Sequence, residues 1–158
     1  MSKDSYLSPF SLATSDVLKE MLDINIDGSE TASEGDLFVS QGFIVVVGFT
    51  GGWKGRFFLD MSSETAIQMA SLLTGDDYDS VGDEDVIMSG AELANIISGN
   101  AITDINNSQP GLNIRLTPPS VFAGDGISMF NVRLSSSSAL MQTNIGTIKI
   151  NVAVEGGK

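Results

Sequence analysis

Apolar residues at helical spacing predict a helix over Ser8–Ile26. Ser8 is a suitable N-cap, and Pro9 would then occupy the first helical position, where its missing N–H costs nothing. A second helix is predicted to open at Ser62 or the serine after it and to close at Gly75. The side chains expected to face the core from the first helix are Phe10, Ala13, Val17 or Leu18, and Met21. The apolar positions of the second helix are Ala66, Ile67, Met69, Ala70, Leu72 and Leu73.

Runs rich in β-branched and aromatic residues predict strands around these helices. Leu37–Thr50 and Trp53–Met61 are expected to pair through a tight turn at Thr50-Gly51-Gly52, and the polar segment Gly28–Asp36 is expected to be a connector. The serine run Ser135–Ser138 is expected to form a hairpin turn. Further strands are predicted at Asn113–Thr117, Ser120–Phe122, Ile127–Leu134, Ala139–Gln142 and Thr147–Val154.

The order of these elements predicts the fold class. Each half of the chain supplies a helix followed by paired strands, which predicts a pseudo-duplicated α+β fold with about three helices packed on a mostly antiparallel β-sheet. A chain of 158 residues is long enough to bury a substantial core, so residues 1–158 are expected to form a single domain.

The longest predicted helix, from about Glu84 to Asn107, carries an unusual outward face. At about 100° per residue its apolar stripe gathers on one side, Glu92 points almost directly away from that stripe, and Asn95 lies about 60° from Glu92. A solvated face more often carries Lys, Arg and Glu in paired positions, so this face is interpreted as a docking surface, with ordinary solvation as the alternative. The stripe is Ile87, Ala94, Ile97, Ala101 and Ile105, and the outward residues around the pair are Met88, Ser89, Ile96, Gly99 and Thr103.

The composition narrows the chemistry that this face can perform. The chain has no cysteine and no histidine, which excludes disulfides, zinc–sulfur sites and any Ser-His-Asp or Cys-His mechanism within it. A net charge of −12 at pH 7 argues against nucleic acid and anionic membranes as partners. The longest strongly apolar run, Phe43–Phe49, is too short to span a bilayer, and the first residues lack a signal-peptide core, so we expect a cytoplasmic protein.

Six carboxylates crowd the linker Gly75–Asp85. An EF-hand loop beginning at Asp77 would place apolar residues at its fifth and twelfth positions, so the bidentate glutamate is missing and only a weak ion site stays open. The stronger interpretation is electrostatic, because Asp83–Asp85 places negative charge on the first turn of the next helix.

The outward pair resembles the signature of the CheX/CheC phosphatases of bacterial chemotaxis, which is Asp or Ser, then Glu four positions on, Asn three positions later, and Pro farther along. Glu92 and Asn95 match it, and Pro118 follows Asn95 after 22 residues, as in the family. The stretches PFSLATSDVLKEM and GGWKGRFFLDMSSETAIQMASLLTG look like the first helix and the hairpin plus second helix of CheX. The Asp/Ser position falls on Met88, so this chain departs from the signature there.

The resemblance implies a phosphatase that hydrolyses the aspartyl phosphate of a CheY-like receiver domain. Asn95 would orient the attacking water, and Glu92 would pair with the receiver's conserved lysine. Mg²⁺ would belong to the receiver, and this chain would bind no cofactor. A homodimer is implied by the likeness to CheX, and because no Glu-x-x-Asn pair occurs around Ser15–Lys19, one site per chain is expected.

The alternative function is a non-catalytic interaction module of the flagellar-switch type, because related architectures bind partners through the same fold and fold does not fix function. Retention of both Glu92 and Asn95 favours catalysis, although the chain departs from the signature at Met88. An ion-binding or structural role for the acidic linker ranks third.

Overall fold

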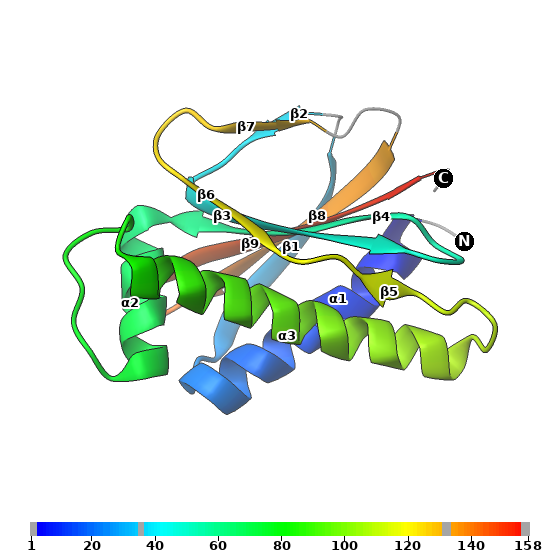
Figure 1. Cartoon of the computed structure of the whole chain (residues 1–158), viewed down its shortest axis with the longest axis horizontal. Coiled ribbons are helices and arrows are strands. Elements are labelled where there is room, and N and C mark those ends of the chain that lie inside the picture. The colour runs from blue at the N-terminus through cyan, green and yellow to red at the C-terminus, as the bar shows by residue number, and fades with distance from the viewer. Residues whose placement is uncertain (1–2, 35–36, 131–133, 156–158) are drawn as a thin grey trace.

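The structure of the protein is a computed structural model that describes residues 3–34, 37–130 and 134–155 (Figure 1). Three helices and nine strands are assigned within these residues. In chain order they are α1 (Lys3–Leu22), β1 (Ile26–Glu34), β2 (Leu37–Val39), β3 (Gly42–Thr50), β4 (Gly55–Ser62), α2 (Ser63–Thr74), α3 (Glu84–Ser108), β5 (Arg115–Leu116), β6 (Ser120–Ala123), β7 (Ser128–Phe130), β8 (Leu134–Thr143) and β9 (Gly146–Glu155).

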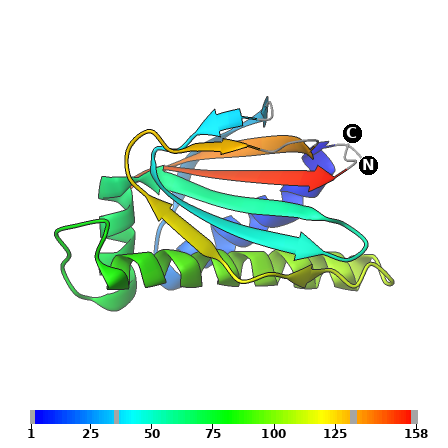
Figure 2. The same ribbon diagram turned by 45° about the horizontal axis from the view of Figure 1, so that its top comes forward.

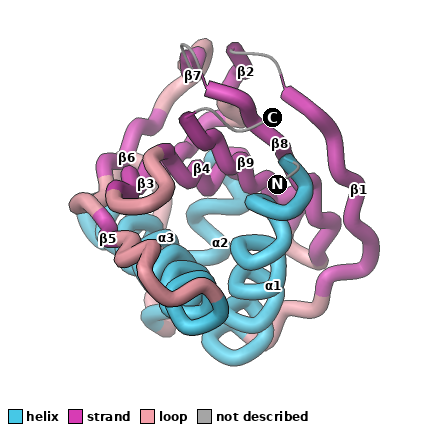
Figure 3. The backbone as a smooth tube through the Cα atoms, turned by 90° about the vertical axis from the view of Figure 1, so that its right-hand side faces the viewer, coloured by secondary structure: helices cyan, strands magenta, loops and turns pink. Residues whose placement is uncertain are grey.

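Seven strands form the main sheet, in the order β1-β8-β9-β4-β3-β5, with β6 also paired to β3. Every pairing within the described strands is antiparallel. The three helices cover one face of this sheet (Figure 2). Strands β2 and β7 pair with each other above the opposite face, so the molecule has a helix layer, a sheet and a small outer ribbon (Figure 3). The predicted fold class, three helices on a mostly antiparallel sheet, is confirmed.

The sheet order also shows the predicted internal duplication. Hairpins β3–β4 and β8–β9 meet at the centre, where β4 pairs with β9. Strand β1, which follows α1, pairs with the second hairpin, and β6, which follows α3, pairs with the first. The strands β2 and β7 pair across the same pseudo-symmetry. Helices α1 and α3 are therefore equivalent elements of two exchanged halves, and α2 has no counterpart in the described chain.

The core lies between the sheet and the helices. Phe10 of α1 stacks on Phe49 and Phe57, with ring centroids 5.7 and 5.2 Å apart, and joins α1 to the central hairpin. A smaller apolar cluster on the other face of the sheet lies beneath the β2/β7 ribbon. Its buried members are Phe38, Ile44, Phe58 and Ala153. Because alternate strand residues enter opposite clusters, both faces of the central strands are buried.

Local signals located α2 and α3 correctly. The Ser62 side chain accepts a hydrogen bond from the Thr65 N–H at the start of α2, and Gly75 ends the helix with a left-handed φ of 83°. Asp83 is the N-cap of α3, and its carboxylate accepts from the Asp85 N–H at 2.9 Å. These side chains satisfy backbone groups that a helix leaves unpaired, which is why the boundaries were predictable.

Helix α1 begins five residues earlier than predicted, at Lys3, so Ser8 is not its N-cap and Pro9 lies inside it. Packing holds the extra turn in place. Leu7 is buried, and the ring of Tyr6 packs edge-to-face against the ring of Trp53, with ring centroids 4.7 Å apart. These contacts offset the hydrogen bond that Pro9 removes. The helix also ends earlier, at Leu22, and residues 23–25 connect it to β1.

Two polar segments predicted as connections are strands. The Gly28–Asp36 segment contributes most of β1, an edge strand that pairs with β8 along its length. The Ser135–Ser138 run lies within β8, where β1 and β9 supply hydrogen bonds on both sides and three of the serines are buried. Distant neighbours therefore override the turn preference of the serine run.

Two predicted strands are interrupted. Leu37–Thr50 divides at Ser40–Gln41, where buried Asp60 accepts hydrogen bonds from the Ser40 hydroxyl and the Gln41 N–H. Of Ile127–Leu134, only Ser128–Phe130 forms β7, residues 131–133 lie outside the described chain, and Leu134 begins β8. Asn113–Thr117 is reduced to the two-residue β5.

Candidate active site on helix α3

Helix α3 is fixed to the sheet along its inner side. Gly90 allows the closest approach, because a Cβ at that position would lie 2.5 Å from ring atoms of Phe43 on β3. Only glycine fits this contact without displacement of the ring, so the core determines the position of the helix. The buried apolar side chains of α3 are Val86, Leu93, Ala94, Ile97, Ala101, Ile102 and Ile105.

The far end of α3 is held by Asn106. Its Nδ2 donates to the Ile114 carbonyl at 3.0 Å, and its Oδ1 accepts from the Ile114 N–H at 2.9 Å. Both amide atoms therefore bind the backbone of the segment that leads to β5. With the Asp83 cap at the other end, these contacts make the helix a rigid support for the residues on its outer face.

Glu92 and Asn95 both lie exposed on the outer face of α3. Neither side chain has a hydrogen-bond or ion-pair partner among the residues that the structure describes. Figure 1 shows α3 lying lengthwise across the molecule. The predicted exposure of this pair is confirmed, and a partner can reach both side chains without any rearrangement of the chain.

The burial of the residues around Glu92 and Asn95 agrees with the prediction except at two positions. Met88, one turn before Glu92, is 60% exposed. Ser89 was predicted to lie on the outer face but is buried, and Ile87 was predicted to be buried but is only half-buried. Ile96 is half-buried against the core. Helical periodicity assumes the same surroundings along the whole helix, whereas α2 packs against α3 beside its N-terminal part (Figure 1).

Pro118 lies at the exposed edge of the sheet, between β5 and β6. Thr117 before it is held against Gly48 of β3, with the Thr117 N–H donating to the Gly48 carbonyl at 2.8 Å. Proline suits this position because an edge strand does not need its N–H. The structure therefore places Pro118 in a supporting position at the edge of the sheet.

The carboxylate of Glu92 and the carboxamide of Asn95 can make two kinds of contact with a partner, ion pairs and hydrogen bonds. The carboxylate of Glu92 can pair with a cation, and the amide of Asn95 can donate and accept hydrogen bonds without changing its protonation state. Because both side chains are exposed, any group on which they act would have to come from a partner that docks on α3.

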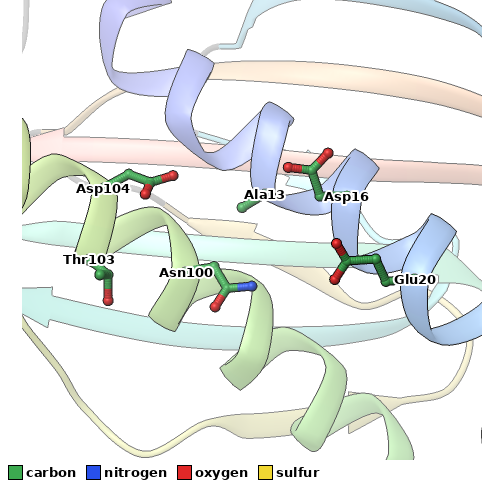
Figure 4. A pocket seen from close by; sticks show the side chains of 6 residues that line it. All are labelled: Ala13, Asp16, Glu20, Asn100, Thr103 and Asp104. Atoms are coloured by element: carbon green, nitrogen blue, oxygen red, sulfur yellow. The ribbon is translucent and has the colours of Figure 1, made fainter.

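A separate hollow of about 260 Å³ lies between α1 and α3 (Figure 4). Asp16 and Glu20 of α1 and Asp104 of α3 direct their carboxylates toward it. No group of three or more His, Cys, Asp or Glu side chains among the described residues is arranged to hold a metal ion. None of the helices in the described part of the chain combines the length and apolar content that a membrane crossing requires.

Comparison with known proteins gives consistent matches. The family model for chemotaxis phosphatase CheX matches residues 43–143, which include α3 and Pro118. The CheY-P phosphatase CheX of Thermotoga maritima is 26% identical over 110 residues, which is 69% of this chain and 69% of that protein.

Two solved structures extend the likeness over nearly the whole chain. The chemotaxis protein CheX of Desulfovibrio desulfuricans has a TM-score of 0.85 and 25% identity, covering 96% of this chain and 99% of the other. CheX in the CheX–CheY–BeF₃–Mg²⁺ complex of Borrelia burgdorferi has a TM-score of 0.74 and 29% identity, covering 95% and 97%. With a family match over 43–143 of 158 residues, the chain belongs to the chemotaxis phosphatase CheX family.

Proposed function

We propose that this chain hydrolyses the aspartyl phosphate of a CheY-like receiver domain, and that Glu92 and Asn95 are the residues that perform the reaction. The observation that carries the residue assignment is the pair itself, two exposed and unpartnered polar side chains on the outer face of a firmly anchored helix. The pair lies within the segment that matches the family.

Asn95 is assigned to the attacking water. Hydrolysis requires water in line with the bond between phosphorus and the receiver's aspartate oxygen, and in-line positioning supplies much of the rate in phosphoryl transfer. The water oxygen forms the new bond to phosphorus, the bond to the aspartate oxygen breaks, and the products are the free carboxylate and inorganic phosphate. The Asn95 amide can orient that water through Oδ1 or Nδ2 without taking up or releasing a proton.

We assign Glu92 to aligning the docked receiver relative to Asn95. It lies about one helical turn from Asn95 on the same face, so an ion pair between Glu92 and a lysine of the receiver fixes where Asn95 meets the phosphoryl group. A net charge of −12 adds a longer-range attraction toward a basic patch on the partner.

The metal ion of the reaction is assigned to the receiver. The Borrelia burgdorferi complex of CheX with CheY contains BeF₃ and Mg²⁺. The described residues of this chain offer no cluster suited to a metal ion, and Glu92 and Asn95 need none for the roles given to them. Mg²⁺ bound to the receiver neutralises phosphoryl charge, and this chain supplies the oriented water and the docking contact.

The proposal includes assembly and location. Residues 1–158 act as one domain, and the chain is a cytoplasmic homodimer in which both α3 faces stay open, because a receiver has to reach each of them. The likeness to CheX proteins supports the dimer, and the absence of cysteine fits a reducing compartment. Light scattering at micromolar concentration that gives the mass of a monomer would contradict the dimer.

The experiment that tests the function measures phosphate release from phosphorylated receiver domains with and without this protein. Acceleration by the wild-type protein, lost in Asn95→Ala, supports the proposal. Equal acceleration by wild type, Asn95→Ala and Glu92→Ala would place the catalytic groups elsewhere. Binding without acceleration would favour the interaction module of the flagellar-switch type.

A further inference from the structure

One glycine of α3 has no reason within this chain to be glycine. A Cβ built at Gly99 meets no atom within 4 Å, and its φ lies outside the left-handed region. Gly90 on the same helix is required by the Phe43 ring, and Gly75 is required by its positive φ. Glycine within a helix is less stable than alanine, so Gly99 makes α3 less stable without any packing gain in the protein alone.

Gly99 lies on the same face as the proposed catalytic pair. At about 100° per residue it lies about 20° from Glu92 and about 40° from Asn95, between the two and one turn closer to the C-terminus. The helix stays regular there, since the Thr103 hydroxyl donates to the Gly99 carbonyl at 2.8 Å. Because the helix is not distorted at Gly99, the glycine does not mark a kink.

The side chain of Asn95 is short, so a receiver whose phosphoryl group it serves must come close to α3, and the lack of a side chain at Gly99 leaves room for this approach. To orient a water that attacks at about 3–3.5 Å, the amide has to enter the recess that holds the phosphoryl group. The receiver surface must then lie almost against the backbone of α3. On the C-terminal side of Asn95, the next residue on this face is Gly99, so a side chain there would be the first to meet the receiver.

We propose that Gly99 is a clearance position, over which a backbone segment of the docked receiver passes in contact with α3. This inference rests on the proposed function and extends it to a residue that touches neither water nor phosphate. Gly99 is a positioning residue, and its effect comes from the absence of a side chain. The bound receiver therefore requires a feature that lowers the stability of the free protein.

The test compares Gly99→Ala and Gly99→Gln with the matched variants Gly28→Ala and Gly28→Gln. A Cβ at Gly28 also meets nothing within 4 Å, and β1 lies at the opposite edge of the sheet from the strands next to α3. The probe is a CheY receiver loaded with beryllofluoride and Mg²⁺, which mimics the phosphorylated state. Its Kd, the kcat/KM for receiver dephosphorylation and Tm are measured for every variant.

The free protein and the complex should respond in opposite directions. Gly99→Ala should raise Tm by about 2–4 °C, because alanine favours the helix. Gly99→Gln should raise Kd about tenfold or more and lower kcat/KM by on the order of 100-fold, with Gly99→Ala between it and the wild type. The Gly28 variants should bind and hydrolyse like the wild type.

Each outcome has one interpretation. Wild-type affinity in Gly99→Gln overturns the clearance role, and so does a lower Tm in both Gly99 variants, because the position would then not be open. A wild-type protein that binds the loaded receiver without hydrolysing phosphate refutes the proposed function alone, and weaker binding by Gly99→Gln would still support clearance. A wild-type protein that binds no loaded receiver overturns both.

Discussion

Two asparagines on the same helix should respond in opposite ways to the same substitution. Asn95 is exposed and unpartnered within the described residues, whereas Asn106, three turns on, holds the Ile114 backbone through both atoms of its amide. We expect Asn95→Ala to abolish most of the activity without loss of stability, and Asn106→Ala to lower stability while leaving the chemical step intact.

The stability effects follow from the contacts. Asn106→Ala removes two neutral hydrogen bonds, worth about 0.5–1.5 kcal/mol each, and alanine returns up to about 0.7 kcal/mol of helix propensity. The net loss of about 1–2 kcal/mol predicts a Tm lower by about 2–8 °C for a chain of 158 residues. Asn95→Ala loses no contact within the described chain and gains the same propensity, so its Tm should stay equal or rise slightly.

The activity effects follow from the proposed roles. Loss of the water-positioning amide should lower kcat by on the order of 100-fold, with the Kd for beryllofluoride-loaded receiver nearly unchanged. Thermal unfolding followed by circular dichroism, together with phosphate release at a temperature well below both transitions, separates the two variants. If Asn95→Ala melted lower than Asn106→Ala and kept its activity, Asn95 would be a structural residue and the assignment of the site would be wrong.

Three further substitutions test the docking contact, the helix anchor and the buried carboxyl. Glu92→Ala should lower kcat and raise the Kd for the loaded receiver, and added salt should reduce its difference in Kd from the wild type, as a titration at several ionic strengths would show. Gly90→Ala should cost about 1–3 kcal/mol in urea unfolding, because its Cβ meets the Phe43 ring. Burial raises the pKa of Asp60 above its ordinary 3.8, so the wild type should lose stability relative to Asp60→Asn as the pH rises from 3.8 through the raised pKa; a constant difference in unfolding free energy would contradict this.

The parts of the fold that the sequence predicted are those with local causes. Ser62, Gly75 and Asp83 end or begin helices through contacts within a few residues, and each boundary was located correctly. The errors lie where the cause is remote. The Ser135–Ser138 run becomes the middle of β8 because β1 and β9 flank it, and the first turn of α1 is held by Trp53, far along the chain. No local pattern contains those neighbours.

The candidate site divides in the same way. The direction of Glu92 and Asn95 followed from helical periodicity, because a regular helix packed on a sheet turns one side outward. The buried state of Ser89 did not follow, because burial depends on the tertiary neighbours of α3, which helical periodicity does not describe. Periodicity alone does not separate Asn95 from Asn106 either, because the partner of Asn106 comes from the segment after the helix.

The proposed catalytic pair, on an open helix face, has a consequence for how function and fold are related. Glu92 and Asn95 contribute no described contact to the folded chain, so their replacement would leave the helix, the sheet and the core unchanged. The same architecture can therefore lose hydrolysis and keep docking without a cost in stability, which is how a phosphatase and a binding module can share one fold. On the proposed assignment, the presence of Glu92 and Asn95, more than the shape of the chain, separates a phosphatase from a binding module. The proposed clearance role of Gly99 adds a second sign that a partner docks on this face, because a glycine that lowers helix stability is expected where a partner occupies the space that it leaves.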